Sequence, residues 1–168
     1  MAFNINLRGH LAAVLLISSG LCQAADLQAE ARYAGIVNGK VANIEQIGSW
    51  NQTRVEQSGA SQQLTQRQDG NRNQAQISQS GANNQAYLQQ TGNANDIVLS
   101  QAGSYNQASL QQNGLNNSAN VQQSGAYNQA QVSQYGNGNQ ASVQQSGFGG
   151  TASVTQYGNN STASIKQW

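Results

Sequence analysis

An eleven-residue repeat runs through residues 40–168 and constrains the fold more than any other feature of the sequence. When the chain is divided into units that begin at residue 40, every unit has Gln at its seventh position. These residues are Gln46, Gln57, Gln68, Gln79, Gln90, Gln101, Gln112, Gln123, Gln134, Gln145, Gln156 and Gln167. The ninth position is Gly in each of the eleven units that reach it. So strict a register predicts a repetitive structure, because a disordered polar tract does not require one.

Two further positions of the unit are apolar and alternate with polar ones. The third position is Ala in nine of the twelve units, and the fifth is aliphatic in all but the one that contains Gln66. The first position is Asn in eight units, at Asn51, Asn73, Asn84, Asn95, Asn106, Asn117, Asn128 and Asn139. The first, third, fifth and seventh positions therefore share one face with a period of two, which indicates a β-strand with one buried face.

We expect each unit to form a seven-residue strand followed by a four-residue turn at the Gly. Two units then make one 22-residue strand-turn-strand rung, and the predicted fold is an all-β solenoid or cross-β stack of such rungs. Tyr105 and Tyr127 have the spacing of one rung, which supports this arrangement. Eleven-residue repeats also occur in helical coiled coils. A Gly in each unit, and apolar positions two residues apart, argue against that alternative.

Stacked units would place identical side chains above one another, about 4.8 Å apart. The chain has 29 Gln and 21 Asn residues, and each side-chain amide can pair with the rung above and the rung below. We therefore predict that the Gln and Asn residues of the repeat form stacking ladders. After Arg72 only Asp96 and Lys166 are charged, the chain has no Pro, and the last unit shows no cap. Open end rungs should thus accept a further copy of the chain.

Residues 1–24 are predicted to be a secretory signal peptide. Arg8 lies before an apolar run at residues 11–17, and small residues at Cys22 and Ala24 place the cleavage site before Ala25. The run is too short to span a bilayer. A lipoprotein signal at Cys22 is the alternative.

The predicted mature chain consists of a leader at residues 25–39 and the repeat domain at residues 40–168. Cleavage removes the only Cys, Cys22, and the only His, His10. Thiol chemistry, histidine catalysis and Cys/His metal sites are then excluded, and we expect no enzyme, cofactor or metal. The net charge of +1 gives no basic surface for nucleic acid.

The unit Q-x-G-x-x-N-x-A-x-φ-x-Q, in which φ is aliphatic, resembles the curlin repeat of bacterial curli fibre subunits. The resemblance covers residues 40–168 and implies secretion through outer-membrane assembly machinery, polymerisation with other curli subunits, and a cell-surface amyloid that serves adhesion and biofilm matrix. Residues 84–101 look more like the minor, nucleating subunit than the major one. The minor subunit usually ends in an irregular basic repeat, however, whereas residues 161–168 are regular. A monomeric secreted β-solenoid binding module is the alternative from another class.

One unit, residues 62–72, departs from the pattern. It has Gln66 at the aliphatic position and carries Arg67, Asp69 and Arg72. One interpretation is drift in a rung that tolerates solvent. The other hypothesis is that these charged residues are gatekeepers that slow premature aggregation.

Overall fold

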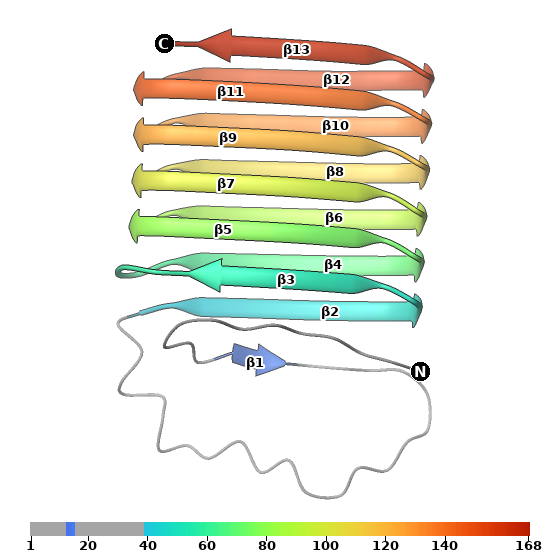
Figure 1. Cartoon of the computed structure of the whole chain (residues 1–168), viewed down its shortest axis with the longest axis horizontal. Helices are drawn as coiled ribbons and strands as arrows, with labels where there is room; N and C mark the ends of the chain where they lie inside the picture. Colours follow the sequence, from blue (N-terminus) through green and yellow to red (C-terminus); the bar gives the residue numbers. More distant parts are fainter. Residues whose placement is uncertain (1–12, 16–38) are drawn as a thin grey trace, which may run out of the picture.

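The computed structural model describes residues 13–15 and 39–168, and the repeat forms a β-solenoid of about six turns (Figure 1). The rest of the predicted signal peptide, and the leader apart from Gly39, lie outside the described residues. The strands are β1 (Ala13–Leu15), β2 (Val41–Ser49), β3 (Gln52–Gln57), β4 (Gln63–Asn71), β5 (Gln74–Ala82), β6 (Gln85–Asn93), β7 (Asp96–Ser104), β8 (Gln107–Leu115), β9 (Ser118–Ala126), β10 (Gln129–Asn137), β11 (Gln140–Phe148), β12 (Thr151–Asn159) and β13 (Thr162–Gln167). Among the described residues, no helix is long and apolar enough to cross a membrane.

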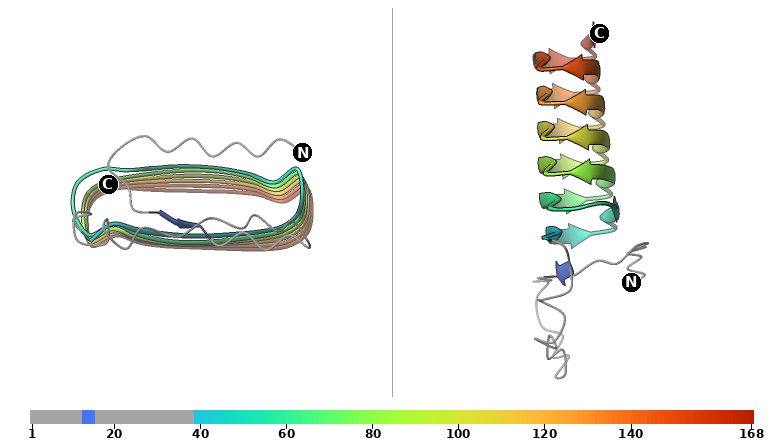
Figure 2. Two further views of the ribbon diagram at one scale, coloured as in Figure 1. Left: turned by 90° about the horizontal axis from the view of Figure 1, so that it is seen from below. Right: turned by 90° about the vertical axis from the view of Figure 1, so that its left-hand side faces the viewer.

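The strands form two parallel sheets that face each other. Sheet I has the order β1-β2-β4-β6-β8-β10-β12, and sheet II has the order β3-β5-β7-β9-β11-β13. From β2 to β11, each strand pairs with the strand two places later in the chain, and each paired residue aligns with the residue 22 positions further on. Seen along the stack, the turns superpose as one flattened oval (Figure 2). The predicted all-β solenoid and its 22-residue rung are therefore confirmed, and the helical alternative is wrong.

The core is a thin layer between the two sheets, built from the third and fifth positions of each unit. In β6, for example, Ala86 and Leu88 are buried while Gln85 and Tyr87 are exposed. The buried apolar residues are Ala42, Ile44, Val55, Leu64, Ala75, Ile77, Ala86, Leu88, Ile97, Leu99, Ala108, Leu110, Ala119, Val121, Ala130, Val132, Ala141, Val143, Ala152 and Val154. The period-two pattern thus places the apolar residues as predicted.

The strands are longer and the turns are shorter than the sequence indicated. Most strands run for nine residues, from the second to the tenth position, so the Gly of the ninth position lies within the strand. The prediction of a four-residue turn at this Gly was wrong. Its role is close packing, because a Cβ on Gly92 would lie 2.1 Å from the carbonyl oxygen of Gly114 in the next rung. The equivalent distance is 1.9–2.1 Å at the other interior glycines of this position.

The chain turns at the eleventh position of each unit, which has a left-handed backbone with φ between 53° and 71°. Gly138, Gly149 and Asn83 suit this conformation. Ala94 and Tyr127 also adopt it, although a left-handed backbone costs such residues about 1–2 kcal/mol. The corner therefore consists of this residue and the first position of the next unit.

Candidate functional site: amide ladders and open sheet edges

The seventh-position Gln residues form two columns, one in each sheet. Sheet I carries Gln46, Gln68, Gln90, Gln112, Gln134 and Gln156, and sheet II carries Gln57, Gln79, Gln101, Gln123, Gln145 and Gln167. Within each column, the Nε2 of one Gln donates to the Oε1 of the Gln 22 residues later, at 2.5–3.0 Å. Nε2 also donates to a backbone carbonyl in the facing sheet, as from Gln90 to Gln74 (2.9 Å). Each interior amide thus uses both donors and its acceptor inside a dry core.

These ladders have a direction, because the donor always belongs to the earlier rung and the acceptor to the later one. At the first rung, Oε1 of Gln46 and of Gln57 is therefore buried without a hydrogen-bond partner among the described residues. At the last rung, Nε2 of Gln156 donates to the backbone of Gln140 (3.0 Å), and Nε2 of Gln167 to that of Thr151 (2.8 Å). One end of each ladder thus presents acceptors, and the other presents donors.

The first-position Asn residues mainly hold the backbone at the corners. The Oδ1 of each Asn accepts the backbone N–H of the residue 22 positions later, at 3.0–3.1 Å. Nδ2 donates to the ninth-position Gly carbonyl 19 residues later, at 2.8–3.2 Å. Direct Asn-to-Asn amide bonds join Asn95 to Asn73, Asn106 to Asn84, Asn117 to Asn95, and Asn128 to Asn106. The sequence indicated stacked amides at this position but not the contacts with the backbone.

The departing unit places polar groups inside the core rather than in solvent. Gln66 is 1% exposed, and its Nε2 donates to the Oγ1 of Thr53 (2.7 Å), which occupies a position that is usually Ala. The same hydroxyl accepts from Nε2 of Gln46 (3.0 Å) and donates to Oε1 of Gln68 (3.1 Å). Gln66 and Thr53 are both buried, so this rung departs from the repeat inside the core as well as on its outer face.

The same unit has Gln62 where Asn is usual. Its Nε2 donates to the carbonyls of Gly81 (2.8 Å) and Ser58 (3.2 Å), but its Oε1 is buried without a partner, as is the Oε1 of Gln66. The four buried side-chain atoms without a partner in the described part of the chain thus all lie between residues 46 and 66.

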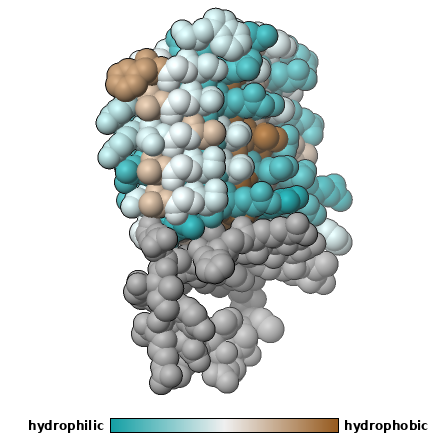
Figure 3. All heavy atoms as spheres, turned by 60° about the vertical axis from the view of Figure 1, so that its left-hand side comes forward, coloured by the Kyte–Doolittle hydropathy of each residue, from teal (hydrophilic) through white to brown (hydrophobic). Residues whose placement is uncertain are grey.

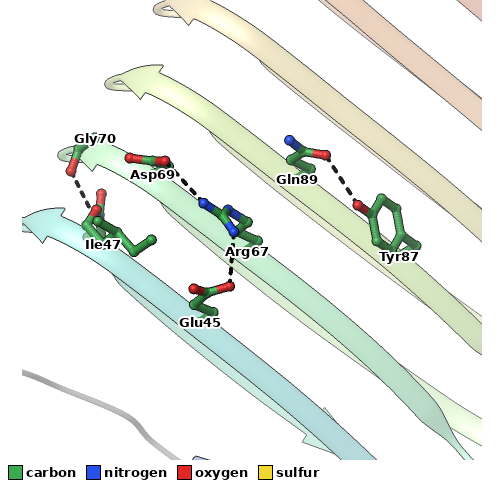
Figure 4. A network of polar contacts seen from close by, with 8 residues as sticks. Glu45, Ile47, Arg67, Asp69, Gly70, Tyr87 and Gln89 are labelled. Carbon is green, nitrogen blue, oxygen red and sulfur yellow. Dashed lines mark hydrogen bonds and ion pairs between the residues drawn. The ribbon is translucent and has the colours of Figure 1, made fainter. Parts of the chain in front are cut away.

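The charged residues of the departing unit, Arg67, Asp69 and Arg72, lie on the outside of the solenoid. Arg67 contacts Glu45 at 3.3 Å and Asp69 at 3.4 Å on the outer face of sheet I (Figure 4). Arg72 occupies a corner with a φ of 57°. Side chains so exposed form ion pairs that contribute at most about 1 kcal/mol each. Of the three proposed gatekeepers, Arg67 and Asp69 therefore lie together, and Arg72 lies apart from them.

Much of the remaining surface is covered by uncharged polar columns, which Figure 3 shows as hydrophilic rows beside paler ones. A groove of about 560 Å³ crosses β4, β6, β8, β10 and β12 and is lined by Gln, Thr, Ser, Ala and Tyr87. Tyr105 stacks on Tyr127 with ring centroids 4.9 Å apart, and Tyr135 stacks on Tyr157 at 5.1 Å. The members of each stacked Tyr pair are 22 residues apart, so the rung length places one ring above the other. The residues that line the groove include no carboxylate, imidazole or thiol.

Asp96 is the first residue of β7 and the second position of its unit, and it is partly buried. Desolvation raises the pKa of its carboxyl group above the ordinary value. Its neighbours in the sheet, Gln74 and Ser118, are uncharged. The charged form of Asp96 is thus less favourable in the folded chain than in water.

The solenoid has two end faces. The first-rung face consists of the outer edges of β2 and β3, and the last-rung face consists of the outer edges of β12 and β13. Ala163 and Ile165 on β13 are only partly buried, whereas the equivalent residues of earlier rungs are buried. On the other face, β1 pairs with three residues of β2. The outer edges of β3, β12 and β13 pair with no further strand among the described residues, and such parallel edges are templates for another strand.

Comparison with known families matches the Curlin associated repeat at residues 70–103, 92–125, 114–147 and 136–167. Consecutive matches advance by one 22-residue rung, and together they cover more than half of the chain. They begin at Gly70, so Thr53 and Gln66 lie outside them. No curated protein and no solved structure matches the chain. The curlin repeat is a structural, non-enzymatic repeat. In this chain it forms the β-solenoid described above. The chain belongs to the curlin repeat family.

Proposed function

We propose that this chain is a structural subunit of an extracellular curli-type amyloid fibre, which grows when the end face of one copy stacks on that of another. The observation that carries the proposal is the pair of buried acceptors, Oε1 of Gln46 and of Gln57, at the first-rung face. These two oxygens have no donor among the described residues, and a further rung in register supplies one. Family membership implies polymerisation with curli subunits outside the cell.

Seeded growth tests this proposal. The chain from Ala25 on, which is the form that signal cleavage would leave, is incubated at increasing concentrations. We expect dye-binding fibres with a β-type circular-dichroism spectrum, whose lag falls with concentration and disappears when preformed fibres are added. A chain that stays soluble and monomeric for days at high concentration would refute the proposal and favour the monomeric binding module.

Two glycines allow a test of stacking at the last-rung face. A Cβ on Gly158 meets no atom within 4 Å in the single chain, whereas the equivalent Cβ on Gly136 would lie 1.9 Å from the Gly158 carbonyl oxygen. Any rung that stacks on β12 in register brings such a carbonyl to Gly158. Gly158→Ala should therefore block fibre growth. Gly149→Ala is the matched control, because Gly149 also has a positive φ and open space but lies at a corner. Equal growth of both variants would contradict stacking at this face.

We also propose the nucleating role of the minor subunit, which rests on the resemblance of residues 84–101. In that role, export across the outer membrane would lead to growth of the major subunit at the cell surface, and so to adhesion and biofilm matrix. Trace amounts of this chain should shorten the lag of a separate curlin-repeat chain. The Gly158→Ala variant at the same concentration is the control. No change in the lag would favour the alternative, a major fibre-forming subunit.

The gatekeeper hypothesis for Arg67, Asp69 and Arg72 belongs to the same proposal. Arg67 and Asp69 lie with Glu45 on the outer face of sheet I, and Gln66 leaves an acceptor without a partner in the core of the same rung. The variant with both Gln66→Val and Asp69→Asn should polymerise after a shorter lag. The single variant Asp69→Asn removes the charge but keeps Gln66 in the core, so it separates the effect of the charge from that of the buried Gln. An unchanged or longer lag in the double variant would reject the hypothesis.

A further inference from the structure

The columns of the solenoid define what a second copy meets if it continues the 22-residue register. The outer edge of β12 then receives β2 of the next copy, and the outer edge of β13 receives β3. In this arrangement Gln156 stacks on Gln46, and Gln167 stacks on Gln57. The donor ends of both ladders therefore meet the two acceptors that have no partner among the described residues of one copy.

Charge is complementary at the same junction. The sixth-position column on the outside of sheet II runs through Glu56, Ser78, Ser100, Gln122, Gln144 and Lys166. Its only charged members are thus the first and the last, and they have opposite signs. When a second copy continues the column, Lys166 of one copy lies one rung from Glu56 of the next.

The chain itself contains a precedent for this contact. Glu45 and Arg67 occupy the sixth position in adjacent rungs of sheet I, and their side chains form an ion pair at 3.3 Å (Figure 4). Arg67 is shared with Asp69 two residues along the same strand. Glu56 is likewise paired with Arg54 on its own strand at 2.5 Å. A charged side chain in this solenoid can therefore pair at once with a residue of its own strand and with a residue of the adjacent rung.

We propose that copies of this chain join head to tail, the last-rung face on the first-rung face, and that an ion pair between Lys166 and Glu56 of successive copies fixes the polarity and register of the junction. This inference rests on the proposed function. Joining two last-rung faces would bring Lys166 of one copy near Lys166 of the other. Joining two first-rung faces would likewise bring the two Glu56 side chains together. Either arrangement also points the ladder amides donor to donor or acceptor to acceptor.

In the full chain, part of the first-rung face is covered. β1 pairs with β2 through Ala13, Val14 and Leu15. These residues lie within residues 1–24, which are predicted to be removed on export. The test therefore uses the chain from Ala25 on, in which β1 no longer pairs with β2.

A pair of charge reversals tests the junction. Lys166→Glu puts two carboxylates at every head-to-tail contact, and Glu56→Lys puts two ammonium groups there. Each variant alone should leave about three- to tenfold more soluble chain at equilibrium with fibres than the wild type does, a difference that shrinks as salt is added. In a 1:1 mixture, copies can alternate so that every junction has opposite charges. The mixture should therefore return to the wild-type concentration of soluble chain.

Gln122→Glu and Gln122→Lys are the matched controls, because Gln122 lies in the same column but in the middle of the stack. These controls should polymerise like the wild type, singly and mixed. The neutral variants Lys166→Gln and Glu56→Gln guard against misfolding of Glu56→Lys beside Arg54, and the two together should cost no more than either alone. The proposal is overturned if each charge reversal polymerises like the wild type, or if mixing gives no recovery. Wild-type fibres grown in the same experiment distinguish this outcome from a failure of the proposed function.

Discussion

Replacing Thr53 with Ala should destabilise the solenoid, although Ala is the usual residue at that position. The Thr53 hydroxyl is the partner of the Gln66 Nε2, and the Oε1 of Gln66 already lacks one. In Thr53→Ala the whole buried amide of Gln66 would be unsatisfied, which costs about 1–3 kcal/mol. Gln46 and Gln68 each lose a bond to the Thr53 hydroxyl but remain bonded to each other at 2.5 Å. We expect a loss of about 2 kcal/mol in the free energy of unfolding.

Gln66→Leu should have the opposite effect. Leu restores the aliphatic side chain of the fifth position and removes the unpartnered Oε1, so we expect a gain of about 1–2 kcal/mol. With Leu at position 66, Thr53→Ala no longer leaves an amide without a partner. Its cost should then fall to about 0.5 kcal/mol, which corresponds to a coupling energy of about 1.5 kcal/mol between the two sites.

Guanidinium chloride unfolding of the monomer, followed by far-ultraviolet circular dichroism below the concentration that gives fibres, measures the four free energies. The dependence on denaturant should be unchanged, so that shifts in midpoint report stability. Thr65→Ala is the control, because Thr65 is exposed on the same strand as Gln66. If Thr53→Ala had the same effect with Gln or Leu at position 66, the reasoning about the buried cluster would be refuted.

Three further changes test the rungs and corners. Gly92→Ala should lower the free energy of unfolding by more than about 4 kcal/mol and abolish cooperative unfolding, because its Cβ would lie 2.1 Å from the Gly114 carbonyl oxygen. An unfolding midpoint equal to that of the wild type would contradict this. Ala94→Asn should raise the unfolding free energy by about 1 kcal/mol, because Asn tolerates the φ of 55° better than Ala; a lower midpoint would argue against corner strain. Asp96 has a raised pKa in the folded chain, so its contribution to stability grows as the pH falls from 7 toward about 4. Asp96→Asn should therefore be more stable at pH 7 and lack this gain on acidification, and parallel pH profiles of the two chains would contradict the assignment.

The architecture was predictable because two independent signals agree. The alternation of apolar and polar positions specifies a strand with one buried face, and the fixed step of eleven residues specifies how strands return to the same place. Together they placed Ala86, Leu88 and Gln90 on the inside of the solenoid, where the structure has them. The spacing of Tyr105 and Tyr127 indicated the 22-residue rung, and their rings stack in the structure.

The turn was mispredicted because Gly has two separate roles. Gly92 has a φ of 110° within a strand and is required by the carbonyl of the next rung, which no local sequence rule describes. The true corner is marked instead by Asn83, Gly138 and Gly149, residues at the eleventh position that tolerate a left-handed backbone.

The Thr53–Gln66 contact was missed for a different reason. Each residue departs from the pattern of its own unit, and the two lie 13 residues apart, which has no meaning within a single strand. Only the packing of sheet II against sheet I brings the third position of one unit next to the fifth position of the following unit. Paired departures in successive units are the signal that could have revealed the contact.

The different variability of Gln and Asn in the repeat follows from their bonds. Asn accepts from backbone N–H groups, and every following residue except Pro has one, so Gly150 and Ser161 can occupy the first position and still donate to Asn128 and Asn139. A seventh-position Gln bonds to the side chain of its neighbour, so any change would leave an amide in the adjacent rung unsatisfied. By that argument the first rung of an isolated solenoid should avoid Gln, because its Oε1 has no donor. Gln46 is nevertheless present there, and its Oε1 is buried without a donor among the described residues. Its presence is understandable if that oxygen accepts from the side-chain amide of another copy. The Gln at the end of the ladder would then have the same hydrogen bonds as those in its middle.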